Sequence, residues 1–427
     1  MPNEENVRHF ILATAGHVDH GKTALVQALT GTDTDRLPEE KARGITIELG
    51  FAHLDLPGFS IGVIDVPGHE DFVRNMIAGV GAIDLALLVV AADDGWMPQT
   101  EEHFQILNYL GVTRGVVALT KSDLGNVETR WAEIRSRLEG SPLTNAPIVT
   151  TSVRDNRGIE ELRATLTKEF SQLSVAREFG KPRLFVDRVF TVHGSGTVVT
   201  GSLSGGSFTR GENVLVQPQN LTARIRGLQS HNQTLEVATP RRRLALNLAD
   251  LAPGQVSRGS TICGAGNANV ARVIDVLLTR SSRLPSSTRP IRNGAMLNLH
   301  FGSARIAARV QLRDRGQLSP NENAIARLRL AEPVSAFAGD RFILRDASER
   351  LTIGGGLVLD STPGAVRFRS LKQRALLDQR AIAPDDLQTL LRTQLERDQF
   401  ANRADMLPSA PFSAEEIAAG LESLGAS

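Results

Sequence analysis

Short apolar runs of strand length recur through residues 10–170. Between them, apolar residues return with the period of an amphipathic helix. Strands and helices that alternate in this way are typical of a mostly parallel sheet covered by helices on both faces. The pattern predicts strands at 10–15, 49–55, 60–65, 85–91, 115–120 and 147–151. It predicts helices near 22–30, 70–80, 99–110, 127–139 and 158–170.

The pattern changes near residues 176–182. From there to about residue 362, short alternating runs such as VVTGSL and ENVLVQP are separated by Gly-rich turns, with almost no helical period. Two small β-barrels, divided near residue 265, are the packing that such runs favour. Helical period returns after residues 362–364. We therefore predict four parts: an α/β domain at 1–175, a first β-barrel at 176–265, a second at 266–362 and a helical segment at 363–427.

Charge is divided unevenly over these parts, although the net charge of the chain is only +1. Residues 1–175 hold 15 Lys+Arg and 25 Asp+Glu, which gives −10, and the remainder holds 33 and 22, which gives +11. A basic second half indicates contact with a polyanion such as RNA. Uneven solvation of the surface is the alternative explanation.

Composition excludes several classes of protein. The single cysteine, Cys263, leaves no internal disulfide framework and no cysteine zinc cluster. No basic-then-apolar signal opens the chain, and no run approaches the ~18 apolar residues of a membrane span. We expect a soluble, cytoplasmic protein, monomeric by default.

Residues 16–23 read GHVDHGKT between the first predicted strand and the first predicted helix. They fit G-x-x-x-x-G-K-[ST], in which backbone N–H groups at a helix N-terminus surround phosphates. The lysine of this motif reaches the outer phosphates, and the threonine supplies a hydroxyl to Mg²⁺. The phosphate-binding residues that we predict are Val18, Asp19, His20, Gly21, Lys22, Thr23, Ala24 and Gly68.

Three further motifs follow predicted strands. DVPGH places Asp65 near the metal, where it acts through water, and lets Gly68 turn its N–H toward a terminal phosphate. TKSD contains an aspartate that can accept from the N1–H and 2-amino groups of guanine, which adenine does not offer. TSV can present N–H groups to the guanine oxygen. The predicted base is guanine, held by Thr120, Lys121, Asp123, Leu124, Ser152 and Val153.

These motifs, in this order, resemble the translational GTPases of the elongation factor Tu group. The resemblance implies that RGITI belongs to the first switch loop and that Thr46 is a second Mg²⁺ ligand beside Thr23. It implies that His69 positions or activates the attacking water, screened by Val18 and Ile45. It also favours a loop-shaping role over metal binding for His17 and His20.

One position departs from the pattern of that group. Thr120 stands where most of its members have asparagine. The shorter side chain should anchor the guanine loop less firmly, so guanine nucleotides should exchange faster, without a separate exchange factor.

A narrower resemblance is to the selenocysteine-specific elongation factors, carried by ALTGTDTDRLPEEKARGITIELGFA at residues 28–52. Only 22 residues separate Thr23 from Thr46, a shorter first switch than in elongation factor Tu. The resemblance implies that Asp187, Arg188 and Arg243 line the pocket for the selenocysteinyl group, and that the second barrel grips the tRNA. A selenolate is anionic at neutral pH, so two guanidinium groups suit it. A solvated or phosphate-binding arginine run at 241–243 is the alternative.

The end of the chain departs from the bacterial members, which continue into winged-helix modules that bind a hairpin in selenoprotein mRNA. LPSAPFSAEEIAAGLESLGAS resembles part of one such module, with Ser413 capping a helix opened by Glu415 and Glu416. A truncated chain is the expectation favoured over a degenerate module. In either case, hairpin binding is expected only when the winged-helix modules are present.

Three functions remain open on the sequence. The leading hypothesis is a GTP-dependent carrier that delivers selenocysteinyl-tRNA to the ribosome at recoded UGA codons. A carrier of initiator or general elongator tRNA is the second. A nucleotide-holding RNA-binding regulator without turnover is the third. Thr46 and His69 are evidence against the regulator, because both are needed mainly for GTP hydrolysis.

Overall fold

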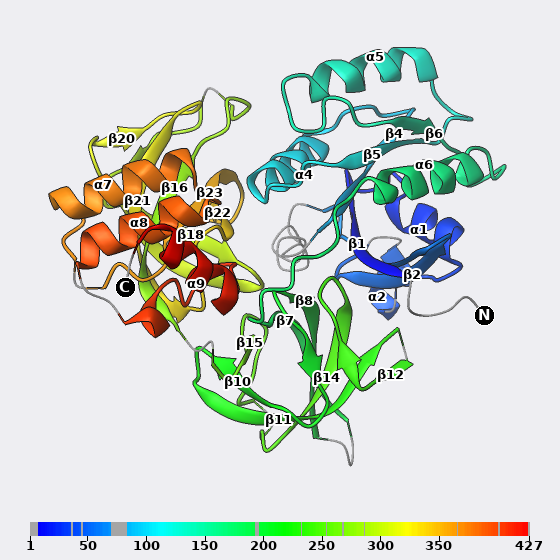
Figure 1. Cartoon of the computed structure of the whole chain (residues 1–427). Coiled ribbons are helices and arrows are strands. Elements are labelled where there is room, and N and C mark those ends of the chain that lie inside the picture. Colours follow the sequence, from blue (N-terminus) through cyan, green and yellow to red (C-terminus); the bar gives the residue numbers. More distant parts are fainter. Residues whose placement is uncertain are drawn as a thin grey trace. The chain divides into compact units, whose positions relative to one another are not determined.

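A computed structural model gives the structure of the chain (Figure 1). It describes residues 7–35, 37–43, 46–69, 83–192, 196–231, 233–252, 254–266, 269–285, 287–364, 366–399 and 402–425. Ile45 and the helix predicted at 70–80 lie outside these residues. The chain divides into two compact units. The first comprises 1–176, 230–232 and 241–243, and the second comprises 177–229, 233–240 and 244–427.

A six-stranded sheet forms the centre of the first unit, in the order β2-β3-β1-β4-β5-β6. All neighbouring strands are parallel except β2, which runs antiparallel to β3. The strands are β1 (Arg8–Ala15), β2 (Gly50–Leu56), β3 (Phe59–Asp65), β4 (Leu85–Ala91), β5 (Gly115–Thr120) and β6 (Ile148–Thr150). The predicted, mostly parallel sheet is thus confirmed, and its strand ends lie where the motifs begin.

Helices cover both faces of this sheet, with α4 and α5 on one side and α1 and α6 on the other (Figure 1). They are α1 (Lys22–Thr30), α4 (Pro98–Tyr109), α5 (Val127–Leu138) and α6 (Ile159–Ser171). Apolar residues of α1 and α6 pack with alternate residues of the strands into one buried core. A short helix, α2 (Pro38–Arg43), precedes β2 and was not predicted.

The second unit begins with a small barrel. Its sheet has the order β10-β15-β7-β8-β14-β11-β12, and an extra pairing of β10 with β11 joins the sheet to itself. The strands are β7 (Arg183–Val192), β8 (Gly196–Ser204), β9 (Phe208–Thr209), β10 (Asn213–Gln217), β11 (Leu221–Ser230), β12 (Gln233–Leu235), β13 (Val237–Ala238), β14 (Arg243–Ala249) and β15 (Thr261–Gly264). Strands β9 and β13 pair with each other.

A second, closed barrel follows, in the order β16-β21-β19-β18-β22-β23. Its strands, with the separate pair β17 and β20, are β16 (Ala271–Thr279), β17 (Ile291–Arg292), β18 (Met296–Phe301), β19 (Ala304–Leu312), β20 (Gln317–Leu318), β21 (Asn323–Val334), β22 (Arg341–Arg345) and β23 (Thr352–Asp360). Alternate residues of each strand enter its core, as expected of a barrel whose other face meets solvent. The two predicted barrels are confirmed.

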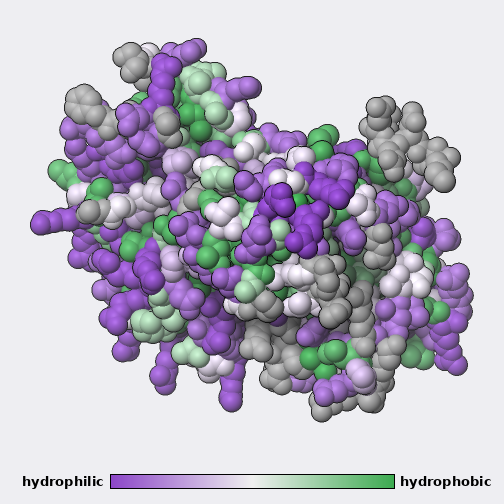
Figure 2. Space-filling model, turned by 90° about the horizontal axis from the view of Figure 1, so that it is seen from below, coloured by the Kyte–Doolittle hydropathy of each residue, from purple (hydrophilic) through white to green (hydrophobic). Residues whose placement is uncertain are grey.

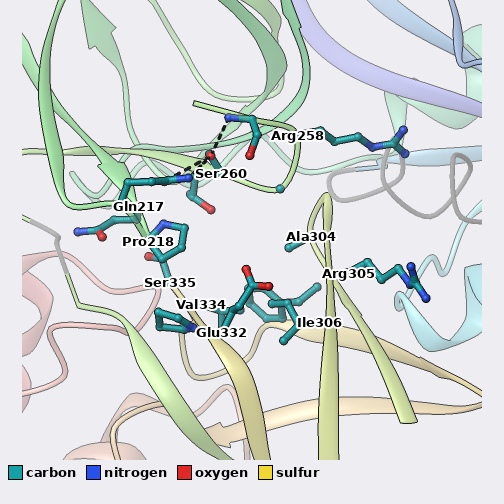
Figure 3. A pocket seen from close by; sticks show the side chains of 16 residues that line it. Gln217, Pro218, Arg258, Ser260, Ala304, Arg305, Ile306, Glu332, Val334 and Ser335 are labelled. Carbon is teal, nitrogen blue, oxygen red and sulfur yellow. Dashed lines mark hydrogen bonds between the residues drawn. The ribbon is translucent and has the colours of Figure 1, made fainter. Parts of the chain in front are cut away.

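The two barrels contact each other within the second unit. Arg183 of the first barrel donates two hydrogen bonds to Asp340 of the second, at 2.7 and 2.8 Å, and its guanidinium lies over the Phe337 ring. A hollow of about 100 Å³ is lined by residues of both barrels. In Figure 3, the side chains of Arg258 and Arg305 extend from opposite walls of this hollow toward the same side.

Helices complete the second unit and lie against the second barrel (Figure 1). They are α7 (Leu371–Ile382), α8 (Leu387–Asp398) and α9 (Ala414–Ser423), with a 3₁₀ turn at Arg403–Asp405. Ser413 caps α9, as the sequence predicted, and Glu416 completes a capping box with it, which was not predicted. The barrel and helices share a buried core in which Leu357 and Leu359 of β23 meet Leu376 and Leu377 of α7.

Among the described residues, no helix is long and apolar enough to cross a membrane. Hydrophilic residues cover most of the face seen in Figure 2, with hydrophobic ones in small groups between them.

Candidate nucleotide-binding site

The loop between β1 and α1 contains several residues with positive φ, a backbone conformation that favours glycine. Gly16 has φ +143°, and a Cβ there would lie 2.2 Å from the Val89 oxygen. Gly21 has φ +82° at the N-cap of α1, and Asp19 has φ 61°. The Gly16 N–H donates to His103 Nδ1 (3.0 Å), and the Val18 N–H donates to Gln99 Oε1 (3.1 Å). Residues from α4 thus fasten the loop at the N-terminus of α1, where anions bind favourably.

Lys22 is buried, and its ammonium group bends back over this loop. Lys22 Nζ donates to the backbone oxygens of Gly16 (3.1 Å) and His17 (2.7 Å). Burial lowers the pKa of Lys22 to about 8, while Asp65 and Asp19 act to raise it. The ammonium has no ion-pair partner among the described residues, so its charge remains available to an anion in the loop.

His20 is enclosed beneath the loop. Its Nδ1 lies 3.3 Å from the Val89 oxygen, and burial lowers the pKa of His20 to about 4. Its ring packs edge-on against that of His17, with centroids 5.1 Å apart. A neutral imidazole in this position supports the shape of the loop.

Asp65, the last residue of β3, is entirely buried and is surrounded by hydroxyl groups. Its Oδ1 accepts from Thr14 Oγ1 (2.9 Å), and its Oδ2 accepts from Thr23 Oγ1 (2.8 Å) and Thr34 Oγ1 (2.7 Å). All three donors are neutral, and Asp65 forms no ion pair within the described residues. A buried carboxylate without a cation is costly, so the site favours binding one.

The three predicted metal-site residues lie together. Thr23 Oγ1 lies 2.8 Å from Thr46 Oγ1, and Thr46 donates to Asp35 Oδ1 (2.9 Å). Burial raises the pKa of Asp35, while the hydrogen bond from Thr46 lowers it. Oxygen atoms from two threonines and two aspartates therefore lie together beside the start of α1. Oxygen is the ligand type that Mg²⁺ prefers.

The loop after β3 passes directly over the phosphate loop. A Cβ on Gly68 would lie 2.4 Å from Lys22 Nζ and 2.6 Å from the Val18 nitrogen. The next residue, His69, is half-buried, as is Val18. Gly68 therefore borders the same space as the phosphate donors, and His69 follows at its rim.

The predicted guanine-binding residues follow β5 and β6, which are parallel neighbours. The buried Thr120 hydroxyl donates to the His20 oxygen (2.7 Å), linking the guanine loop to the phosphate loop. The Ser122 N–H donates to the Thr151 oxygen at 3.2 Å, which joins the loops after the two strands. Ser152 is buried and exchanges backbone hydrogen bonds with Arg157.

The remaining members of the guanine set reach the surface. Lys121 has φ 52° and forms an ion pair with Asp93 (2.9 Å). Asp123 Oδ2 lies 3.9 Å from Arg154 Nη1. The apolar side chains of Leu124 and Val153 are 61% and 39% exposed. Exposed apolar side chains beside a half-exposed lysine stem offer a surface on which a planar base can lie.

Several residues that complete the site were not predicted. Thr14, Thr34 and Asp35 contribute oxygen atoms around Asp65 and Thr46, and Gln99 and His103 hold the phosphate loop. Thr34 and Asp35 fall within the stretch that carries the narrower resemblance, which was the available signal. Gln99 and His103 lie on α4, where their type and spacing gave no signal.

The predicted selenocysteinyl-pocket residues lie on two strands of the first barrel's sheet. Asp187 is the bulged residue of β7, because the register with β8 shifts between Val186 and Arg188. It is buried and accepts from Thr200 Oγ1 (2.7 Å). Arg243, the first residue of β14, packs with the first unit, where its guanidinium carbon lies 3.3 Å from the Phe51 ring centroid.

Known proteins and sequence families resemble this chain. The profile "Elongation factor Tu GTP binding domain" matches residues 7–172, and "Selenocysteine-specific elongation factor, beta-barrel domain" matches residues 278–365. Elongation factor Tu 2 of Streptomyces avermitilis is 31% identical over 84% of this chain and 99% of its own length. The chain therefore belongs to the elongation factor Tu family of translational GTPases.

Within that family, the identity to selenocysteine-specific elongation factors is higher than the identity to this elongation factor Tu. The selenocysteine-specific elongation factor of Desulfomicrobium baculatum is 43% identical over 86% of this chain and 58% of its own length. The crystal structure of a bacterial selenocysteine-specific elongation factor, EF-Sec, superposes with a TM-score of 0.83 at 32% identity, over 95% of this chain and 66% of that one. These matches confirm the predicted resemblance to selenocysteine-specific elongation factors. The chain spans about 58% of the length of the Desulfomicrobium relative.

Proposed function

We propose that this chain binds GTP, carries selenocysteinyl-tRNA and delivers it to the ribosome at recoded UGA codons, with hydrolysis of GTP triggered there. The observation that carries the proposal is the joining of the phosphate loop, Asp65, Thr46 and the guanine loop into one set of contacts at the ends of adjacent strands. We infer the cargo, selenocysteinyl-tRNA, from the similarity to selenocysteine-specific elongation factors.

In this proposal, the loop at residues 18–24 and the Gly68 N–H surround the phosphates of GTP or GDP. Lys22 exchanges its backbone acceptors for phosphate oxygens, which gives charged rather than neutral hydrogen bonds. Thr23, Thr46 and, through water, Asp65 would hold Mg²⁺, which would neutralise charge on the phosphates. The buried Asp65 carboxylate with only neutral donors fits that ion.

Asp123 selects guanine by accepting from its N1–H and 2-amino groups. Backbone N–H groups near Ser152 and Val153 face the guanine oxygen, and Lys121 and Leu124 cover the faces of the base. The exposure of Leu124 and Val153 supports this assignment, because a bound base would cover both side chains. Thr120 ties this loop to the phosphate loop.

Turnover depends on His69, which would position the water that attacks the terminal phosphate. Thr46 holds the first switch loop to the metal site while that phosphate is present, and its release after hydrolysis frees the loop. Because coupling between two sites is reciprocal, the GTP form should bind the tRNA better than the GDP form.

The selenocysteinyl group would be held by Arg188 and Arg243, with Asp187 orienting one of them or bonding the α-amino group. The bulge at Asp187 supports this role, because bulges re-aim side chains at functional positions. The stacking of Arg243 on Phe51 is the contact that it would exchange for the selenolate.

The remaining parts of the proposal concern organisation and partners. The domain limits stay as predicted, at 1–175, 176–265, 266–362 and 363–427, with a partial winged-helix-like helical segment. The partners are selenocysteinyl-tRNA and the ribosome, with the mRNA hairpin added only where winged-helix modules are present. We place the protein in the cytoplasm, as a monomer.

Protection of selenocysteinyl-tRNA from ester hydrolysis tests the cargo and the coupling together. We expect slow hydrolysis with the chain and GTP, and fast hydrolysis with GDP or with seryl-tRNA as cargo. Arg243→Ala should lose protection while keeping GTP binding, because loss of one partner of a buried charge pair costs roughly 2–5 kcal/mol.

The alternatives predict other outcomes of the same measurement. Equal protection of seryl-tRNA and selenocysteinyl-tRNA would favour a general or initiator tRNA carrier. Protection that does not depend on the nucleotide, with no ribosome-stimulated phosphate release, would favour a regulator without turnover.

A further inference from the structure

We propose that Arg241 is a positioning residue that holds Arg243, through an ion pair with Asp84, where the selenocysteinyl group would bind. This role rests on the proposed function, which places Arg243 in that pocket. It deepens that function by adding a residue that selects the cargo without touching it. The alternative for residues 241–243, a solvated or phosphate-binding arginine run, would leave Arg241 in solvent.

The side chain of Arg241 is fastened within the first unit instead. Arg241 Nε lies 2.8 Å from Asp84 Oδ1, and the side chain of Asp84 is only 9% exposed. Arg241 Nη1 donates to the Ser174 oxygen (2.5 Å), and the guanidinium carbon lies 5.2 Å from the ring centroid of the buried Phe10. All of these residues belong to the first unit. A carboxylate, a backbone oxygen and an aromatic ring therefore hold Arg241 in one place.

The backbone of Arg241 indicates that these contacts determine the local path of the chain. Arg241 has φ 63°, a conformation that is unfavourable for a residue with a Cβ. Backbone of this kind persists only where the surrounding structure imposes it. The bonds to Asp84 and Ser174 supply that constraint. The side chain of Arg241 therefore fixes the turn that leads into β14.

Asp84, the partner of Arg241, is itself tied to the central sheet. Its Oδ2 accepts from the Ile11 N–H (2.8 Å), and its own N–H donates to the Ile11 oxygen (3.0 Å). Ile11 lies in the middle of β1, the strand that leads to the phosphate loop. Burial raises the pKa of Asp84 to about 6, while Arg241 acts to lower it and so favours the carboxylate. The anchor of Arg241 is thus a fixed point of the sheet.

Arg243 follows Arg241 by two residues and begins β14. Because two residues of chain span at most about 7 Å, an anchored Arg241 leaves Arg243 little freedom. The Ser230 hydroxyl donates to the Arg243 oxygen (2.9 Å), and a Cβ on Gly62 would lie 3.8 Å from the Arg243 Cβ. The Arg243 guanidinium lies over Phe51. A side chain that is already fixed in place loses less entropy when it binds a ligand.

Protection of the ester bond from hydrolysis tests this role on the whole chain with GTP, using selenocysteinyl-tRNA and seryl-tRNA that share one tRNA body. Arg241→Asn removes the guanidinium but keeps a residue that tolerates positive φ. Its affinity for selenocysteinyl-tRNA should fall roughly fivefold, the cost of ordering one long side chain on binding. Its affinity for seryl-tRNA should stay within about twofold of wild type, because serine offers no selenolate to Arg243. A loosened fold would lower both affinities alike.

Further variants show whether Arg241 acts through Asp84 and Arg243. Arg241→Lys keeps the charge beside Asp84 and should recover most of the affinity for selenocysteinyl-tRNA. Arg241→Asn/Asp84→Asn leaves no unpaired buried charge, so it should fold normally and show the same loss as Arg241→Asn. In an Arg243→Ala chain, Arg241→Asn should cause no further loss. The matched control is Arg210→Asn in the first barrel, which breaks an exposed ion pair with Glu236 and should bind within about twofold of wild type.

Hydrogen exchange in peptides that cover residues 241–249, measured without tRNA, should be several-fold faster in Arg241→Asn than in wild type. Unchanged exchange there, a wild-type preference for selenocysteinyl-tRNA in Arg241→Asn, or an equal loss in Arg210→Asn would overturn the role of Arg241. A wild-type chain without that preference would contradict the proposed function and this role with it, so the two failures are distinguishable. GTP affinity should be unchanged in the Arg241 variants.

Discussion

Two buried carboxylates show how differently the two units use a charge inside the fold. Asp65 in the first unit and Asp275 in the second are both 0% exposed. Asp65 accepts hydrogen bonds from three neutral threonine hydroxyls. Asp275 instead receives two bonds from Arg327, at 2.7 and 2.8 Å, and one from Gln373 at 2.8 Å.

This difference in partners indicates a ligand-binding role for Asp65 and a structural role for Asp275. Around Asp275, the network continues through Gln373 to Asp360 (2.9 Å) and from Asp360 to Arg397 of α8 (2.7 Å). It therefore ties the helices to the second barrel with its charges already compensated. Asp65 keeps a charge that no described cation pairs, which suits it to the Mg²⁺ ion of the proposed function.

Arg327→Met should give the largest effect on stability. It leaves Asp275 buried without its partner, which costs about 3–5 kcal/mol. Thermal unfolding followed by circular dichroism, with hydrogen exchange in β16 and β21, measures the loss. The paired change Arg327→Met/Asp275→Leu is the control, and it should recover most of the stability because no buried charge remains. Equal stability of the single variant and wild type would show that Asp275 does not depend on Arg327.

Asp65→Asn should have little effect on stability and a large effect on Mg²⁺ binding. It removes a charge that lacks a cation, so the unfolding free energy without nucleotide should change by less than about 1 kcal/mol. Both tryptophans, Trp96 and Trp131, lie in the first unit, so their fluorescence follows its unfolding. The affinity for Mg²⁺ with GTP should fall by about 10- to 100-fold, the usual effect of removing a group that orients a metal site.

A large loss of stability in Asp65→Asn, with unchanged dependence of GTP binding on Mg²⁺, would contradict this interpretation. Asp65 would then be a structural residue like Asp275, and the comparison between the two units would fail.

The same contrast explains which parts of the molecule could be predicted from sequence. Asp65 and Thr120 each end a strand of a parallel sheet. Because such ends meet at one edge, the motif residues and their order at the predicted strand ends were enough to predict that the motifs lie together. Thr34 and Asp35 could not be placed, because they lie in a segment without period and reach the site only through tertiary contacts.

In the second unit, the sequence predicted the two barrels but not the arrangement of side chains on their surfaces. Alternation identifies strands, yet the bulge at Asp187 shifts the register by one residue, and no local pattern marks it. A hollow beside the second barrel is lined by Arg329 of β21 and by Arg367 and Arg369, about 40 residues later, so this grouping depends on packing that periodicity does not encode.

Thr120→Val gives the smallest expected effect and tests a single neutral bond of the first unit. It removes the hydroxyl that donates to the buried His20 oxygen, which costs about 1–3 kcal/mol in the link between the two loops. Release of a fluorescent GDP analogue, followed by stopped flow, should therefore be roughly fivefold faster or more. Thr120→Ser keeps the hydroxyl and should release GDP at nearly the wild-type rate. Thr120→Asn restores the residue usual in the family and should release it more slowly. If all three variants released GDP at the wild-type rate, the link through Thr120 would not control exchange.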